Sequence, residues 1–159
     1  MEVKRKGFRS ETDLVRAALE SPQLRDFLDP DFAPMMLIEP RGLFGVPDAV
    51  LTNLDLRDGE WCCGTTTALE MKLRNWKRAL AQAFRYRSFA HVAYVVLDAA
   101  HAKPAIKAIE RFRRSRVGLI TVDQNGVVEF HYTPDPDQPV CEQMTQRFFN
   151  VFTTYIEAP

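Results

Sequence analysis

The sequence predicts an α/β fold in which a central mixed β-sheet is flanked by helices. Amphipathic helical segments alternate with short runs of β-forming residues. A helix follows the third run, and such a crossover places the next strand parallel to a neighbour. The apolar share of 46% in 159 residues is enough to close one core. We therefore expect one domain over residues 1–159, ordered α, β, β, β, α, β in a core at about 10–97 and α, β, β, α in a C-terminal elaboration at about 98–159.

Each element is justified by the period of its apolar residues and by the capping or turn residues at its ends. Ser10 can cap the first helix, and Pro22 indicates a loop after it. Asp58-Gly59 and Asn125-Gly126 are dipeptides typical of hairpin turns. Phe84 is expected on the apolar face of its helix. In chain order we expect a helix at 10–20, strands at 35–39, 46–53 and 61–72, a helix at 74–88, a strand at 91–97, a helix at 103–114, strands at 117–122 and 127–132, and a helix at 140–155.

Composition and charge exclude several classes of protein. Lys plus Arg equal Asp plus Glu at 21 each, so no overall field draws the chain to nucleic acid or to a membrane. No run approaches the ~18 apolar residues of a membrane span, so we expect a cytoplasmic protein with no membrane partner. Cys62, Cys63 and Cys141 form neither a disulfide framework nor a zinc motif. The three histidines are scattered, and each is expected to be an ordinary strand or surface residue.

Two acids and a lysine form the strongest candidate site. Glu70 and Lys72 are two positions apart on a strand, so their side chains leave the same face. This short pattern also arises by chance and then marks a solvated strand face. Asp48, at the preceding strand, adds a second carboxylate, although it could also be a simple turn residue. Mg²⁺ needs oxygen ligands and is held by one or two carboxylates plus a substrate phosphate. Lys72 could then position water or neutralise transition-state charge.

These residues resemble the PD-(D/E)XK phosphodiesterase superfamily, which includes restriction endonucleases, RecB-type nucleases and archaeal Holliday-junction resolvases. Pro47-Asp48 is similar to the family's Pro-Asp, and Glu70-Met71-Lys72 is similar to its acid-x-Lys. The resemblance implies a restriction-endonuclease-like core of the order αβββαβ, as expected here from Ser10 to Leu97. The interval from Asp48 to Glu70 is longer than in most relatives, which leaves Asp55 as a competing ligand.

Further positions fit the same resemblance. Glu11 is in line with the apolar stripe of the first helix and is expected to face inward, where an acid is costly unless paired or bound to a metal. The alternative is a first-turn acid favoured by the helix dipole. Gln82 and Tyr86 are similar to the Gln-x-x-x-Tyr motif of RecB-like members. The resemblance implies a catalytic set of Asp48, Glu70, Lys72, Glu11, Gln82 and Tyr86, with Asp48, Glu70 and Glu11 as ligands of Mg²⁺, for which Mn²⁺ would substitute.

A stretch without acids surrounds the candidate site. Residues 71–97 contain six Lys or Arg side chains and no Asp or Glu. A cationic surface of this kind binds the phosphates of nucleic acids. We expect nucleic-acid contacts from Arg74, Lys77, Arg78 and Arg85. Basic residues at 103–116 extend the surface, and a solvated helix is the alternative there.

The leading hypothesis is a Mg²⁺-dependent deoxyribonuclease that acts on duplex or branched DNA. The main alternative is a catalytically inactive module of the same fold that serves nucleic-acid binding or protein assembly. A third class is a subunit that docks through Phe148, Phe149 and Phe152 of the last helix, although such a stripe is more often core. The sequence leaves open whether the chain forms a homodimer.

Overall fold

A mixed sheet organises the molecule, as predicted. The structure is a computed structural model that describes residues 4–28 and 35–157, apart from the side chains of residues 54 and 55. The competing ligand Asp55 therefore lies outside the described side chains. In these residues the sheet has the order β1 (Met35–Ile38), β2 (Ala49–Arg57), β3 (Glu60–Lys72), β4 (Val92–Asp98), β5 (Gly118–Val122) and β6 (Val128–Tyr132). The helices are α1 (Glu11–Glu20), α2 (Pro22–Leu28), α3 (Trp76–Tyr86), α4 (Lys103–Lys107), α5 (Ile109–Ser115) and α6 (Glu142–Glu157), and a 3₁₀ turn, η1, spans Ala99–His101.

Strand pairing follows the predicted topology. The α3 crossover makes β3 and β4 parallel, and β4 is parallel to β5, whereas the outer pairs are antiparallel. The hairpin between β2 and β3 turns at Asp58 and Gly59, whose φ angles are +52° and +81°. Positive φ at both positions is typical of a tight hairpin turn. Ser10 caps α1 as predicted, because its Oγ accepts the Asp13 N–H at 3.1 Å.

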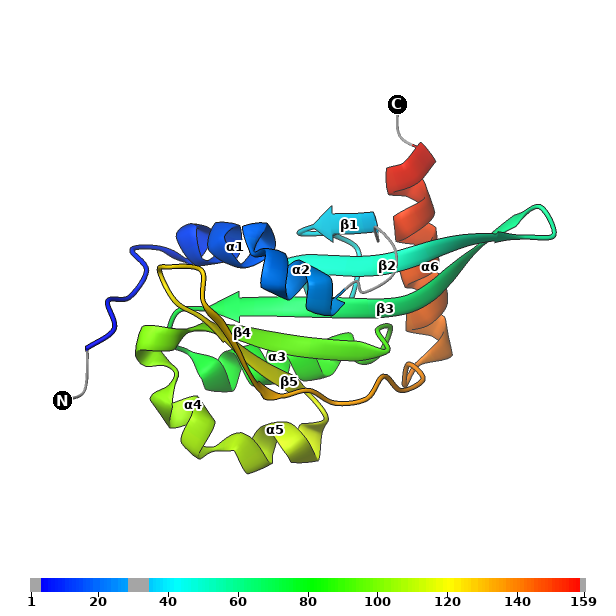
Figure 1. Ribbon diagram of the computed structural model, residues 1–159. Coiled ribbons are helices and arrows are strands. Elements are labelled where there is room, and N and C mark those ends of the chain that lie inside the picture. Colours follow the sequence, from blue (N-terminus) through cyan, green and yellow to red (C-terminus); the bar gives the residue numbers. More distant parts are fainter. Residues whose placement is uncertain (1–3, 29–34, 158–159) are drawn as a thin grey trace.

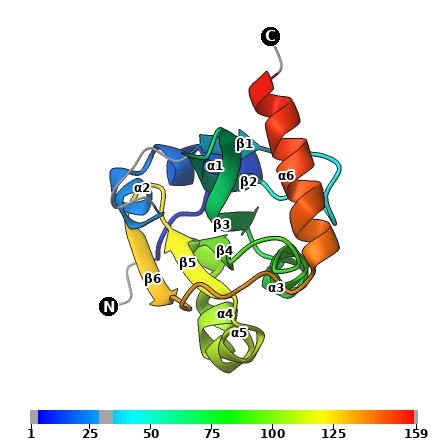
Figure 2. The same cartoon turned by 90° about the vertical axis from the view of Figure 1, so that its right-hand side faces the viewer.

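Two hydrophobic layers cover the sheet. On one face, α1 and α2 contribute Leu14, Ala18 and Leu24 to the core. On the other face, α3, α4, α5 and α6 pack around the buried rings of Tyr86, Phe89, Phe112, Phe148 and Phe152. Figures 1 and 2 show α1 and α2 on one side of the strands, with α3 and α6 on the other. The core interpretation of the α6 aromatic stripe is confirmed for Phe148 and Phe152, which are almost fully buried.

Three local expectations were wrong. The segment after Pro22 begins a helix, α2, because Ser21 caps it by accepting the Leu24 N–H at 3.3 Å and proline is tolerated in a first helical turn. Prolines 30 and 34 lie outside the described residues. The helix expected at 103–114 is two helices, because Ala108 leaves the helical region with φ −97° and ψ 23°. Phe84 is 51% exposed, since the buried side of α3 is formed by other residues.

The length and apolar content of the described helices bear on whether they could span a membrane. None of those in residues 4–28 and 35–157 is long and apolar enough to cross a bilayer.

Candidate active site

Asp48 is hydrogen-bonded to β3, the strand that carries Glu70. Asp48 immediately precedes β2, and its N–H donates to the Leu69 carbonyl on β3 at 3.0 Å. Its Oδ2 accepts the Met71 N–H at 2.6 Å, which fixes the carboxylate against the same strand. Burial raises the pKa of Asp48, although the Met71 N–H and the nearby Lys72 ammonium act in the opposite direction. The structure thus brings the two predicted acids together.

Glu70 is a buried acid with two partners. Its residue is only 2% exposed. The Tyr86 hydroxyl donates to Oε2 at 2.6 Å, and Lys72 Nζ lies 3.3 Å from Oε1. Burial raises the pKa of Glu70, the Tyr86 hydrogen bond opposes this rise, and the charge of Asp48 adds to it. A carboxyl pair in which both pKa values are raised is typical of functional sites.

Lys72 lies between two carboxylates. Its ammonium is 3.3 Å from Glu70 Oε1 and 3.4 Å from Glu11 Oε2. Burial lowers the pKa of Lys72, but the charges of Glu70, Glu11 and Asp48 outweigh burial and raise it overall. Lys72 therefore stays protonated at neutral pH. It can neutralise negative charge but cannot act as a general base there.

The inward orientation expected for Glu11 was wrong. Its side chain is 50% exposed and reaches Lys72 from the first position of α1. The buried residues of α1 are Leu14 and Ala18, so the core contact begins one turn after Glu11. The alternative of a first-turn acid describes its position better.

Gln82 and Tyr86 play different parts in the structure. Tyr86 is 1% exposed and holds Glu70, and this burial together with the Glu70 carboxylate raises the pKa of its hydroxyl. Gln82 Oε1 is buried and has no hydrogen-bond partner among the described residues. Gly45 also contributes to the site, although its place before a predicted strand indicates only a break in the chain's β structure. With φ +94°, Gly45 packs so closely that a Cβ would lie 3.1 Å from the Tyr86 ring.

A two-acid metal site fits this donor set better than the predicted three-acid site. Within residues 4–28 and 35–157, no group of three His, Cys, Asp or Glu side chains is placed to hold a metal ion. Glu11 is paired with the Lys72 ammonium, which stands between it and Glu70. Asp48 and Glu70 remain, and two carboxylates suffice for Mg²⁺ when a substrate phosphate contributes further oxygens. Burial is the main cause of both raised pKa values, and the charge of Asp48 further raises that of Glu70; a bound cation would favour the ionised form of both carboxyls.

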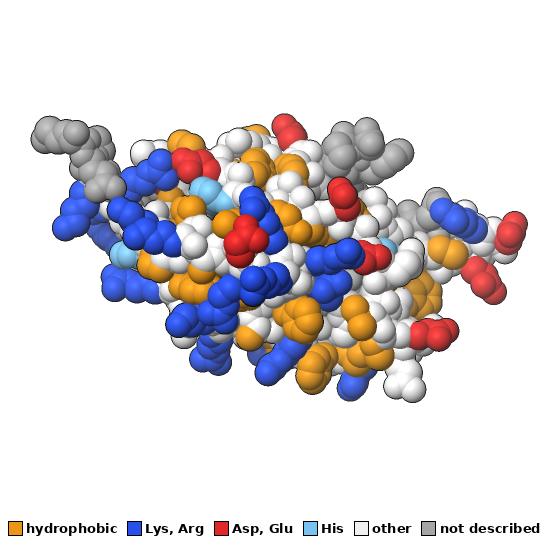
Figure 3. Space-filling view, turned by 90° about the horizontal axis from the view of Figure 1, so that it is seen from below, with side chains coloured by type: hydrophobic (Ala, Val, Ile, Leu, Met, Phe, Trp, Pro, Cys, Tyr) orange, Lys and Arg blue, Asp and Glu red, His pale blue; other side chains and the backbone are white. Residues whose placement is uncertain are grey.

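The predicted nucleic-acid contacts lie together on an exposed surface. Arg74, Lys77, Arg78 and Arg85 are all exposed, on α3 or just before it. Figure 3 views the side of the molecule below the sheet of Figure 1, where Lys and Arg side chains gather with hydrophobic groups among them. Among the basic residues at 103–116, Arg113 pairs with Glu110 and Arg116 pairs with Asp137, each at 2.6 Å. These two pairings reduce the charge that these residues offer to phosphates.

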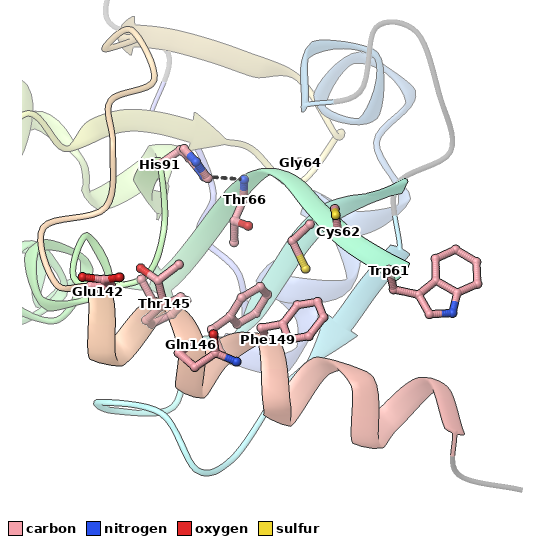
Figure 4. Close-up of a pocket in the computed structure, with 12 residues that line it drawn as sticks. Trp61, Cys62, Gly64, Thr66, His91, Glu142, Thr145, Gln146 and Phe149 are labelled. Carbon is pink, nitrogen blue, oxygen red and sulfur yellow. Dashed lines mark hydrogen bonds between the residues drawn. The ribbon is translucent and has the colours of Figure 1, made fainter. Parts of the chain in front are cut away.

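A separate cavity of about 410 Å³ lies between the first half of β3 and α6. Figure 4 shows His91 and Thr66 at its edge, with Phe149 and the polar side chain of Gln146 projecting from α6. His91 Nδ1 accepts the Thr66 N–H at 3.0 Å, and burial lowers the pKa of His91. The neutral His91 ring accepts a hydrogen bond from the β3 backbone. Asp48 and Glu70 are therefore the stronger candidates for catalysis.

Comparison with known proteins places the fold but not the function. No protein-family model matches the chain, and neither does any curated protein. Among solved structures, the chain is similar to the SPO1766 protein of unknown function from Silicibacter pomeroyi. The two share 17% sequence identity and a TM-score of 0.52, over 89% of this chain and 83% of that chain. Identity at this level shows a likeness of fold alone.

Proposed function

We propose that this protein is a Mg²⁺-dependent phosphodiesterase of the PD-(D/E)XK type that hydrolyses the backbone of a nucleic acid, with DNA as the substrate. One observation carries the proposal. Two carboxyls with raised pKa values, Asp48 and Glu70, lie together with the protonated Lys72, and α3, the helix after the strand of Glu70, exposes a basic surface. The resemblance of Pro47-Asp48 and Glu70-Met71-Lys72 to the motifs of that superfamily supports the proposal.

The residues would divide the chemistry as follows. Asp48 and Glu70 would hold the divalent cation. When bound, the cation supplies Lewis-acid polarisation of a phosphoryl oxygen and makes a water more acidic. Lys72 would neutralise charge that builds on the phosphoryl oxygens. Tyr86 fixes the orientation of Glu70, and the arginines of α3 would hold the phosphate backbone.

The inactive module is the second candidate, and one observation favours it. Both Glu70 oxygens are engaged, by Tyr86 and by Lys72, and the residue is 2% exposed. If Glu70 keeps these partners permanently, the acid-x-Lys pair is a buried structural ion pair and the basic surface alone is functional.

Cleavage of end-labelled single-stranded, duplex, nicked and branched DNA with Mg²⁺ or Mn²⁺ tests the proposal. Asp48→Ala and Lys72→Ala are expected to abolish cleavage and to leave DNA binding largely intact. Asp58→Asn, at the exposed hairpin turn, is the matched control and should cut normally, because Asn tolerates positive φ. Cation-dependent cleavage retained by either site variant would overturn the assignment.

A thermal melt with and without Mn²⁺ detects metal binding independently of cleavage and helps to separate the two candidates. A bound ion stabilises the folded state by mass action, so Mn²⁺ should raise the Tm of the unmodified protein and have no such effect on Asp48→Asn. If Mn²⁺ leaves the Tm unchanged and no substrate is cut, yet salt-dependent DNA binding persists, the inactive module is correct.

A further inference from the structure

Two phenylalanine rings are exposed within the basic surface of α3. Phe84 is 51% exposed and Phe44 is 55% exposed. Isolated exposed apolar residues are common and need no explanation. Phe44, however, lies beside Arg85, which is expected to contact nucleic acid, and Phe84 lies beside Arg87, so the surface combines flat apolar rings with cations.

Each ring is next to a guanidinium group. The Arg85 guanidinium lies 5.7 Å from the centre of the Phe44 ring, and the Arg87 guanidinium lies 5.7 Å from that of Phe84. Arg87 is itself held in place, because its Nη1 donates to the Ser115 carbonyl at 3.0 Å. These cation–π contacts orient the rings while each keeps about half of its surface open.

Both rings belong to segments that also contact Glu70 or its partner Tyr86. Phe84 and Arg85 immediately precede Tyr86 on α3, whose hydroxyl donates to Glu70 at 2.6 Å. On the other side, Phe44 precedes Gly45, which packs against the Tyr86 ring. A strand that contacts both rings would therefore run over the exposed side of α3, whose buried side carries Tyr86.

We propose that Phe44, Phe84 and Arg85 form a binding surface for single-stranded nucleic acid, with bases stacked on the two rings and phosphates at the arginine. Single-strand binding sites combine a positive surface with aromatic rings on which bases stack. In a duplex the base faces are already stacked on one another, so exposed rings gain little and cations alone suffice. The surface therefore selects a single strand, or the single-stranded arm of a branched molecule. This inference refines the proposed function and rests on it for the identity of the substrate.

Binding without catalysis is the direct test. Fluorescence anisotropy in EDTA would compare a labelled oligothymidylate with a duplex of equal length, so that cleavage cannot occur. Phe44→Ala and Phe84→Ala should each weaken single-strand binding by roughly 5-fold to 100-fold, the loss typical of one stacked base. Both should leave duplex binding within about two-fold. Tyr155→Ala, which removes an exposed ring on α6, is the matched control and should bind normally.

Two conservative variants exclude a packing effect. Phe84→Leu keeps an apolar side chain without a flat ring and should lose binding, whereas Phe84→Tyr keeps the ring and should retain it. Unchanged single-strand binding in Phe44→Ala and Phe84→Ala, or equal losses for duplex and single strand, would overturn the inference. If Asp48→Ala abolishes cleavage but the ring variants bind single strands normally, the nuclease proposal is supported and only the single-strand surface is refuted. If the ring variants lose single-strand binding but the unmodified protein cuts no substrate, the single-strand surface is supported and the nuclease proposal is refuted.

Discussion

The Tyr86 hydroxyl donates a hydrogen bond of 2.6 Å to the Glu70 carboxylate, and both residues are almost completely buried. This contact joins the last turn of α3 to the middle of the sheet. A buried carboxylate is costly unless it is paired and hydrogen-bonded, and Tyr86 supplies one of its two partners. The same bond orients the candidate metal ligand, so stability and chemistry depend on one hydroxyl group.

Tyr86→Phe removes that hydroxyl and keeps the ring. The Tyr86 hydrogen bond holds down the pKa of Glu70, so its loss should raise this pKa further. A hydrogen bond to a charged group contributes about 1.5–3 kcal/mol, and we expect a loss of that size at neutral pH in urea unfolding. Tyr155→Phe, on the exposed side of α6, is the control and should be neutral. Equal stability of the two variants would contradict a structural role for the bond.

Asp48→Asn is expected to stabilise the protein while removing activity. Burial raises the pKa of Asp48, so the folded chain holds a proton on it more tightly than the unfolded chain. Stability therefore falls as pH rises from the unfolded to the folded pKa, and the deficit persists above both. The gain from Asn should be larger at neutral pH than below the ordinary aspartate pKa of 3.8. A Tm gain that does not depend on pH would contradict this reasoning.

Lys72→Met should destabilise the protein more than Glu11→Gln. The Lys72 charge lowers the pKa of buried Glu70, so its removal raises that pKa and leaves the carboxylate short of a partner. Glu11 is an exposed partner of Lys72, and pairs of this kind contribute at most about 1 kcal/mol. Urea unfolding followed across pH should show a loss for Lys72→Met that grows toward neutral pH. A similar small effect for both variants would count against the buried pair.

Asp98 is a second buried acid, which the sequence analysis did not select. It is fully buried at the end of β4 and accepts the Phe8 N–H at 2.8 Å and the Ala100 N–H at 3.0 Å. Asp98→Ala leaves these partly buried donors without their acceptor, and a fully buried unsatisfied group costs about 1–3 kcal/mol, so we expect a loss of up to that size for each. Asp98→Asn keeps an acceptor oxygen and should lose less. Thermal unfolding checks the order, and equal losses would indicate that the charge of Asp98 matters more than its acceptor oxygens.

Capping and turn residues predicted the ends of helices and strands correctly where few residue types are tolerated. Ser10 marked the start of α1, and Asp58-Gly59 marked the hairpin, because caps and tight turns accept few residue types. The prediction is wrong at α2, because a proline such as Pro22 is typical of a break after a helix and is equally well tolerated in the first turn of the next one. It also failed at Ala108, since alanine favours a continuous helix and no local pattern marks the interruption.

The amino-acid pattern predicts the strands, their order and the placement of Asp48, Glu70 and Lys72 at neighbouring strands, because strand periodicity and turn chemistry are local. The surroundings of each charge depend on how distant segments pack together. Packing buried Glu70 beneath Tyr86, left Glu11 exposed beside Lys72, and turned Phe84 toward solvent. Burial and charge pairing depend on segments far apart in the chain, so no local pattern contains them.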